Sequence, residues 1–209
     1  MFKDNTLVQY IEQLASRTPT PGGGSAAALA GCLGAALISM AANFTTGERY
    51  KEVEEDVHDV LKSAKSLMDK LIPLIDEDSI SYRKVQSAYK LPKETTDEKD
   101  KRSIAIQEAL KENIGVSMDI CRHSYTAAAL CDVLADKGNP MLLGDVGSGI
   151  VMLWAAFQSS LLNVETNLKN VKDERFIIEA RRSIEPMARE IEKIRGSIME
   201  KVRKKLSIV

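Results

Sequence analysis

Two carboxylic acids near the middle of the chain, Asp76 and Asp78, are the strongest candidates for acid–base chemistry. Asp78 falls on an apolar stripe with helical spacing, whereas Asp76 falls off this stripe. A carboxyl group on the core side of a helix loses hydration, which raises its pKa and favours the protonated form. Such a group suits general-acid catalysis near neutral pH. The structural alternative is a solvated acid beside a kink, or a buried cap. The stripe consists of Leu71, Ile75, Tyr82, Val85 and Tyr89.

A glycine-rich segment before an alanine-rich stretch is the second candidate. Backbone N–H groups at the start of a helix can bind an anion or a carboxylate. The segment lacks the lysine of a phosphate-binding P-loop, which excludes that motif. The structural alternative is a tight turn in which Ser25 caps the helix. The candidate binding residues are Pro21, Gly22, Gly23, Gly24 and Ser25.

Further candidates lie farther along the chain. The segment around Asp145 and Gly147 has the same two interpretations, and Asp145 could also bind the polar edge of a ring. Lys93 and Arg102 flank an expected helix start at Thr96 and could contact acidic groups of a substrate. Solvated surface charge is the alternative for both. The cysteines and the two histidines form no zinc motif, so we expect no bound metal.

The elements that would position these residues are helical throughout. Apolar residues recur every three or four positions, and no segment alternates with period two. We therefore expect an all-α bundle of about six helices, several of them long, in one domain over residues 1–209. The helices should start after Asp4 or Asn5 and then occupy about 25–44, 50–89, 96–137, 150–168 and 174–206.

Prolines and glycines should interrupt this pattern. Pro73 and Pro186 should bend two helices, and Gly115 is a candidate break in a third. The glycines at 144–149 predict a loop before the fifth helix.

Composition narrows the class of protein. The 29 basic and 30 acidic residues nearly cancel, so we expect no nucleic-acid partner. Two uncharged stretches approach the length of a membrane span, but both are rich in small residues, which favours buried core helices and no membrane partner. The N-terminus has no signal-peptide pattern, so we expect a cytoplasmic protein.

The order of several motifs resembles the cyclodeaminase/cyclohydrolase family of folate enzymes, which includes the C-terminal domain of formiminotransferase-cyclodeaminase. The resemblance covers essentially the whole chain. One departure is Gly144, where Ser would be expected before the aspartate. The motifs are Thr18-Pro-Thr-Pro-Gly-Gly-Gly-Ser25, Asp76-Glu-Asp78, Ala88-Tyr-Lys-Leu-Pro-Lys93, Gly138-Asn139, Gly144-Asp-Val-Gly147 and Asn163-Val-Glu-Thr-Asn-Leu168.

The resemblance implies an all-helical homodimer with its active site in a groove near the subunit interface. It also implies a tetrahydrofolate derivative as substrate, which could be polyglutamylated, and no bound cofactor. A cyclodeaminase closes 5-formiminotetrahydrofolate to 5,10-methenyltetrahydrofolate and releases ammonia. A cyclohydrolase opens the methenyl compound with water to give 10-formyltetrahydrofolate. A formiminotransferase is a further candidate partner.

The catalytic acid of the family matches the segment from Asp76 to Asp78. Pattern and resemblance therefore agree on Asp78, with Asp76 as the fallback. The resemblance also implies that the Gly22–Ser25 loop and Asp145 shape the folate site. We hypothesise that Lys93 and Arg102 bind the glutamate tail.

We expect the cyclodeaminase reaction ahead of the cyclohydrolase reaction. The alternative from a different class is a non-catalytic helical dimerisation or scaffold module. Such a module would account for the apolar seam from Ile177 to Ile198, which has the spacing of a coiled coil.

Overall fold

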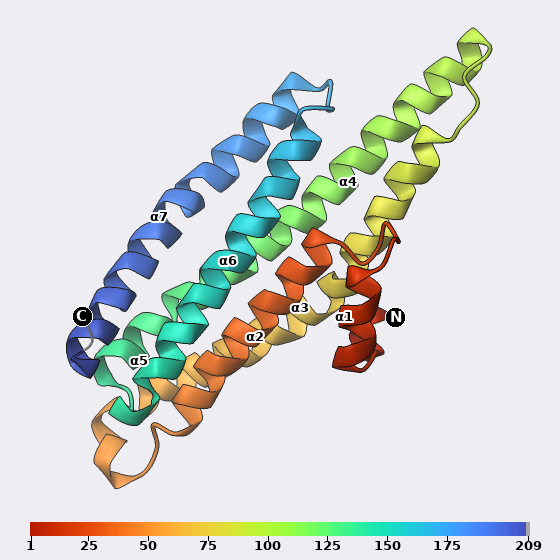
Figure 1. Ribbon diagram of the computed structural model, residues 1–209. Helices are drawn as coiled ribbons and strands as arrows, with labels where there is room; N and C mark the ends of the chain where they lie inside the picture. Colours follow the sequence, from red (N-terminus) through yellow and green to blue (C-terminus); the bar gives the residue numbers. More distant parts are fainter. Residues whose placement is uncertain (208–209) are drawn as a thin grey trace.

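The chain folds into an all-α bundle, which confirms the expected fold class (Figure 1). The computed structural model describes residues 1–207, and these contain no strand. Six of their helices have nine or more residues. The α-helices are α1 (Leu7–Ala15), α2 (Gly23–Asn43), α3 (Glu54–Tyr89), α4 (Thr96–Ala129), α5 (Cys131–Lys137), α6 (Leu143–Leu168) and α7 (Glu174–Leu206). The short 3₁₀ helices are η1 (Phe2–Asp4), η2 (Glu48–Val53) and η3 (Pro140–Leu142).

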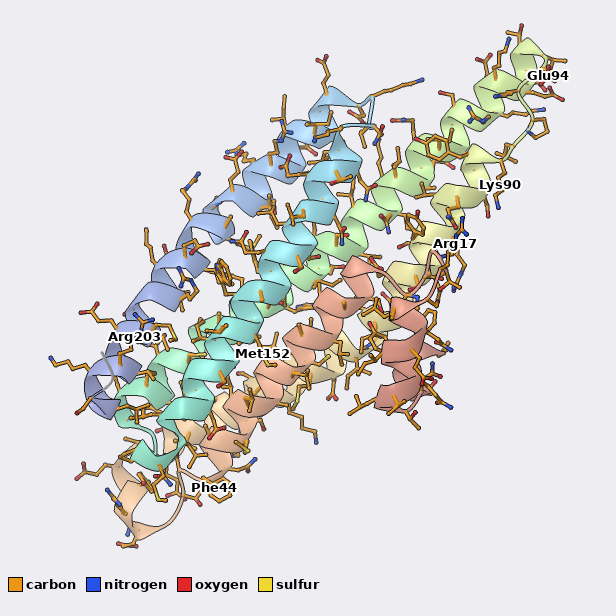
Figure 2. All side chains as sticks on the ribbon, viewed as in Figure 1. Arg17, Phe44, Lys90, Glu94, Met152 and Arg203 are labelled. Atoms are coloured by element: carbon orange, nitrogen blue, oxygen red, sulfur yellow. The ribbon has the colours of Figure 1, made fainter. Side chains whose placement is uncertain are left out.

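Four long helices form the centre of the bundle. Helix α2 packs against α3 and α6, and α4 packs against the same two helices. Helix α7 covers α6 and α4, while α1 stands at the opposite side of the molecule (Figure 1). Helices α3 and α4 continue as a pair beyond the other elements and turn near Lys90 and Glu94 (Figure 2).

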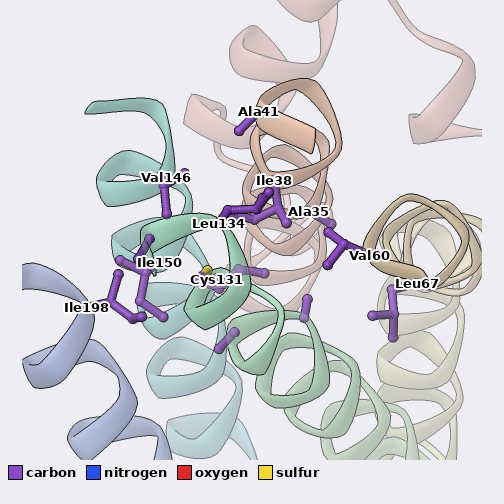
Figure 3. Packing of buried hydrophobic residues seen from close by; sticks show 14 of the residues in the cluster. Ala35, Ile38, Ala41, Val60, Leu67, Cys131, Leu134, Val146, Ile150 and Ile198 are labelled. Atoms are coloured by element: carbon purple, nitrogen blue, oxygen red, sulfur yellow. The ribbon is translucent and has the colours of Figure 1, made fainter. Parts of the chain in front are cut away.

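The largest apolar cluster joins side chains from helices that are distant in sequence. Figure 3 shows Ile38 of α2, Val60 of α3, Leu134 of α5, Ile150 of α6 and Ile198 of α7 in this cluster. All five side chains are buried. The packing therefore fixes the relative positions of the helices that carry the candidate site residues.

Helices α2 and α6 run antiparallel and touch through glycines. A Cβ atom on Gly34 would lie 2.6 Å from Leu153 Cγ and 3.0 Å from the Gly149 carbonyl oxygen. A Cβ atom on Gly149 would lie 2.8 Å from Ile38 Cδ1. These contacts confirm that the small residues of α2 admit a neighbouring backbone.

The loop expected over residues 144–149 is part of a helix. Helix α6 begins at Leu143 and includes all three glycines of this segment. Gly147 packs against Val202, and Gly149 packs against α2. The prediction was wrong because these glycines serve close contacts between helices, which local sequence patterns do not distinguish from turns.

Helix α4 continues through Gly115, the candidate break. Pro73 and Pro186 lie inside α3 and α7, the helices expected to contain them, and a bend at either proline stays a prediction. The expected helix over residues 96–137 divides at Leu130 into α4 and α5. The cap of α4 is Thr95, whose side chain and backbone form a capping box with Glu98.

The apolar seam of α7 is used inside the chain. Ile184, Ile191 and Ile198 are fully buried in the largest apolar cluster. This side of α7 packs on α6, α4 and α5. The seam is therefore not free for a partner helix, which removes one support of the scaffold alternative.

Two helical segments have the length and composition that a membrane span would need. They are α2, with a mean hydropathy of 1.8, and Pro140–Leu168, with a mean hydropathy of 1.5. Within the apolar 18-residue stretch of each segment, 56% and 44% of the residues are buried inside the chain. Both are central helices of the bundle, and each still has one apolar side that the chain does not cover.

Candidate active site

Asp78 lies where the start of α2 meets the middle of α3. Only 8% of its surface is exposed. Its Oδ2 accepts a hydrogen bond from the Ser25 backbone N–H at 3.0 Å. Burial raises the pKa of Asp78, and the Ser25 N–H opposes this with a smaller lowering effect. The carboxyl group therefore keeps its proton to a higher pH than a solvated aspartate, as its place on the apolar stripe predicts.

The glycine-rich segment approaches this carboxyl group closely. A Cβ atom on Gly24 would collide with Asp78 Oδ1, so this position requires glycine. Helix α2 begins at Gly23, and Ser25 lies buried in its first turn instead of capping it. Of the two interpretations of this segment, the helix start that receives a carboxylate matches the structure, and the carboxylate belongs to the chain itself.

Helix α1 contacts Ser25, the residue whose backbone N–H binds Asp78. The Tyr10 hydroxyl and Ser25 Oγ are 2.9 Å apart, and both side chains are buried. Burial raises the pKa of Tyr10, so its hydroxyl stays protonated. Tyr10 is the one buried residue of α1. The N-terminal helix therefore supports the residue whose backbone binds Asp78.

Asp76 is buried as well, which contradicts its predicted position off the buried side of the helix. It is 6% exposed, and its Oδ1 accepts the Phe2 backbone N–H at 2.6 Å. Helix η1 lies against α3 here and covers the carboxylate. The periodicity of α3 cannot reveal this cover because it comes from a distant segment. Asp76 lines a separate cavity of about 440 Å³, with Phe2 and Arg83.

Asp78 forms one wall of a cleft of about 260 Å³. The N-terminal segment forms the rim, and Tyr82 lies one helical turn beyond Asp78 on α3. Pro21, within this segment, is buried and does not line the cleft. The rim residues are Pro19, Thr20, Gly22, Gly23 and Gly24.

The opposite wall is polar, and the candidate residues chosen from the sequence do not include it. It consists of Asn113 on α4 and Asn163, Thr166 and Asn167 on α6. The three α6 residues are spaced i, i+3, i+4, so they share one face of a largely apolar helix. That spacing is a sequence signal by which these three residues could have been identified as site candidates. Asn113 has none, because one polar residue in a mixed helix is common.

Two predicted binding residues lie at the tip of the α3–α4 pair. Lys93 is in the connection between these helices, close to the labelled Lys90 and Glu94 in Figure 2. Arg102 donates two hydrogen bonds to the Tyr89 carbonyl, at 3.1 and 3.3 Å. Neither residue lines the cleft, and their contact with a glutamate tail stays a prediction.

Two further predicted residues lie at the far end of α6. The 18 residues from Asp145 to Asn163 span about 27 Å of helix. Gly147 packs against Val202, away from the cleft. Within one chain, Asp145 and Gly147 therefore do not reach Asp78.

The chemistry available in the cleft is proton transfer at Asp78 and hydrogen bonding by amides. Residues 1–207 contain no cluster of three or more His, Cys, Asp or Glu side chains that could hold a metal ion.

Comparison with a family model decides the classification. Residues 6–186 match the model described as formiminotransferase-cyclodeaminase. The chain belongs to this family. A methenyltetrahydrofolate cyclohydrolase from Methylorubrum extorquens is 37% identical, over 99% of this chain and 100% of its own length.

Other members of the formiminotransferase-cyclodeaminase family are named for the cyclodeaminase reaction. The chicken formimidoyltransferase-cyclodeaminase is 33% identical over 83% of this chain, which corresponds to 32% of the chicken protein. The crystal structure of formiminotetrahydrofolate cyclodeaminase from Thermotoga maritima superposes with a TM-score of 0.82 and 30% identity, over 99% of this chain and 98% of that one. The resemblance seen in the sequence motifs is thereby confirmed, and the family includes proteins named for each reaction.

Proposed function

We propose that this protein acts on the one-carbon unit of a tetrahydrofolate derivative, with Asp78 as the acid–base group. The observation that carries the proposal is a buried carboxyl group that opens onto a polar cleft. Its position matches the catalytic acid that the sequence motifs indicate. The names of the family members agree with this substrate class.

The first candidate reaction is the cyclodeaminase reaction. In the substrate with a protonated formimino group (N5–CH=NH2+), N10 attacks the formimino carbon and loses its proton. The formimino nitrogen, now an amino group, gains one proton as its bond to carbon breaks and departs as ammonia, and the 5,10-methenyltetrahydrofolate cation remains. One carboxyl group can accept the first proton and donate the second. Because burial raises the pKa of Asp78, the acid form that this departure needs persists to a higher pH than in a solvated aspartate.

The second candidate reaction is hydrolysis of 5,10-methenyltetrahydrofolate to the 10-formyl compound. A specific observation favours it: the relative named as this cyclohydrolase is 37% identical, compared with 30% for the cyclodeaminase of known structure. Here the carboxylate form of Asp78 would take a proton from the attacking water, and the acid form would return it to N5 as the C–N5 bond breaks. The second proton of the water is released to solvent when the formyl C=O group forms. Both reactions thus place the same carbon next to the same side chain.

An assay with both substrates tests the proposal. Purified enzyme receives 5-formiminotetrahydrofolate or 5,10-methenyltetrahydrofolate, while methenyl absorbance and ammonia are recorded together. Enzyme-dependent ammonia release supports the cyclodeaminase, and faster loss of methenyl absorbance without ammonia supports the cyclohydrolase. Comparison of the two kcat/KM values ranks them. No turnover of either substrate by folded protein would overturn the proposed function.

The chain spans about a third of the chicken relative, whose name includes a formimidoyltransferase. We propose that a separate formiminotransferase supplies the formimino substrate if the cyclodeaminase reaction is the physiological one. A coupled assay with such a transferase, formiminoglutamate and tetrahydrofolate should then release ammonia only when both proteins are present.

We also propose that the protein is a homodimer through the uncovered sides of α2 and α6. Helix α2 rests on α3 and helix α6 rests on α4, while α2 and α6 pack on each other, so their free sides point the same way and lie next to each other (Figure 1). Leu33 on α2 and Phe44 directly after it are 44% and 60% exposed, and Val151 and Leu162 on α6 are 42% and 69% exposed. Helix α2 carries no charged residue at all. This surface is too apolar to remain in water.

The size of this surface suits a second copy of the chain. Helices α2 and α6 are about 31 and 39 Å long and lie ~10 Å apart, so together they present roughly 600 Å². A stable dimer buries about 800 Å² on each partner, which flanking residues can complete. A twofold axis in the plane of this surface and perpendicular to the helices would also bring Asp145 of the partner subunit to the Asn163 end of α6.

Subunit mixing tests this arrangement. Asp78→Asn and Asp145→Ala chains should each be inactive alone, and their mixture should regain activity because one site of the mixed dimer keeps both wild-type residues. Val151→Glu should give a monomer by light scattering, whereas Ile178→Glu, at an exposed apolar position on α7, should not. A wild-type monomer at every concentration would refute the dimer. Active Asp145→Ala enzyme would refute the shared site.

A further inference from the structure

The polar wall opposite Asp78 contains hydrogen-bonding groups that the proton transfer does not use. Asn113 is 3% exposed, yet its amide faces a cleft that Asn163, Thr166 and Asn167 also line. Burial of an amide is unfavourable unless its groups are hydrogen-bonded. The partners of these amides therefore indicate which groups remain for a ligand.

A chain of hydrogen bonds fixes the orientation of these amides. Ser81 Oγ donates to the Asp78 carbonyl at 3.0 Å, so it must act as acceptor toward Asn113 Nδ2, at 2.7 Å. Asn113 Oδ1 in turn accepts from Asn167 Nδ2 at 2.8 Å. Each amide is thereby held in one of its two possible flips, because the opposite flip would place donor against donor or acceptor against acceptor.

Asn167 is the end of this chain and keeps both kinds of group for a ligand. One Nδ2 hydrogen bonds to Asn113, which leaves the second hydrogen and the Oδ1 atom. A carboxamide with a free N–H and a free C=O pairs with a lactam edge through two hydrogen bonds, as asparagine does with base edges in nucleic acids. The 4-oxo and N3–H groups of a pterin form such an edge.

We propose that Asn167, oriented by Asn113 and Ser81, recognises the 2-amino-4-oxo edge of the pterin ring. This inference rests on the proposed function, since it assigns the ring of the same substrate. Asn167 Oδ1 accepts N3–H, and Asn167 Nδ2 donates to the 4-oxo group. N5, which carries the one-carbon unit, is peri to the 4-oxo group, so this unit then lies in the cleft that Asp78 also lines.

The size of the cleft agrees with this placement. A volume of about 260 Å³ lies below the range of ~300–1,000 Å³ that encloses a drug-sized ligand. The pterin ring therefore fits inside the cleft, and the aminobenzoyl-glutamate tail extends past the rim. Arg83 lies at that rim, where its guanidinium donates to Thr20 Oγ1 at 3.3 Å.

Folic acid and aminopterin are a matched pair of probes, because they differ only in a 4-oxo or a 4-amino group. The 4-amino ring presents a donor and an acceptor in the reverse order, which the fixed amide opposes. Calorimetric titration of the wild-type enzyme should give about 5- to 150-fold tighter binding of folic acid, the range of a two-bond contact to a base edge.

Three variants separate recognition from general effects on the fold. Asn167→Leu keeps the volume and should remove the preference between the two probes. Ser81→Ala should reduce it, because Asn113 and Asn167 are then free to flip together. Asn170→Leu is the matched control, since Asn170 is exposed and outside the cleft, and should leave the preference unchanged.

The outcomes distinguish this inference from the proposed function. Equal affinities for the two probes, in enzyme that turns over a folate substrate, would overturn the role of Asn167 alone. The same holds if Asn167→Leu, folded by circular dichroism, keeps the wild-type preference. Absence of both turnover and folate binding would overturn the proposed function as well.

Discussion

The two ends of the antiparallel α2–α6 pair use similar polar residues in opposite ways. At the end near η3, the Thr45 hydroxyl donates to the Ala41 carbonyl at 2.8 Å and accepts the Asn139 N–H at 3.0 Å. The Asn139 side chain bonds to the Phe44 carbonyl and accepts the Met141 N–H. We call this end closed, because the side chains of Thr45 and Asn139 have their partners within the chain.

The other end is open. Asp78 Oδ1 and Asn167 Oδ1 accept no hydrogen bond from the described residues, although Asp78 is buried and both side chains line the cleft. A fold gains stability when buried polar groups are paired, so unpaired groups at one end and paired groups at the other indicate different roles. The comparison separates residues that hold the bundle together from residues kept available for a ligand.

Removal of the acid should have the largest effect on activity. Asp78→Asn should lower kcat about 10²–10⁴-fold, the usual contribution of a positioned acid–base group. The exposed neighbour Glu77 offers the control Glu77→Gln, which should keep wild-type turnover.

Asp78→Asn should also change how the stability of the protein depends on pH. Because burial raises the folded-state pKa of Asp78, the stabilisation due to its protonated form is lost as pH rises through that value. Asparagine has no such transition, so Asp78→Asn should raise Tm relative to wild type more at pH 8 than at pH 4. Calorimetric scans at the two pH values measure this, and a difference in Tm that does not change with pH would contradict the raised pKa.

A side chain at residue 24 should have the next largest effect on activity. Gly24→Ala should lower kcat/KM about 10²-fold, because the new Cβ atom pushes the Asp78 carboxyl group out of place. Gly196→Ala is the control, since Gly196 lies outside the cleft and a Cβ atom there would meet nothing within 4 Å. Steady-state kinetics on both variants give the comparison. Equal kinetics would show that the close approach of Gly24 to Asp78 has no role.

Disruption of the closed end should have the smallest effect on activity and a clear effect on stability. Thr45→Val removes the acceptor of the Asn139 N–H and should cost about 1–3 kcal/mol of unfolding free energy, with kcat unchanged. Urea denaturation measures the loss, and the exposed Thr46→Val serves as control. A fall in kcat at this end would remove the distinction between the two ends.

Local periodicity predicts the helices and the burial of Asp78, because both depend on neighbours three and four residues away. It does not predict the burial of Asp76, which the distant Phe2 covers. The helical start of α6 escapes prediction for a similar reason: Gly147 and Gly149 read as turn residues until Val202 and Ile38 are seen against them.

The two sides of the candidate site differ in the same way, because local sequence predicts one side and not the other. The Gly24 and Asp78 side of the cleft follows from motifs within two short segments. The Asn113 and Asn167 side depends on two helices whose approach is set by packing, and their hydrogen bond joins residues 54 positions apart. Asp145 lies at the wrong end of α6 within one chain, so its predicted role depends on a second chain.

The glycine contact between α2 and α6 also bears on the order of folding. Gly34 and Gly149 are 115 positions apart in the sequence, whereas α3 and α4 meet across a connection of six residues, 90–95. Loop closure disfavours the distant pairing, so the α3–α4 hairpin can form before α2 meets α6. The cleft needs all four helices, and it is therefore a late product of folding that a nascent chain cannot have until α6 has been synthesised.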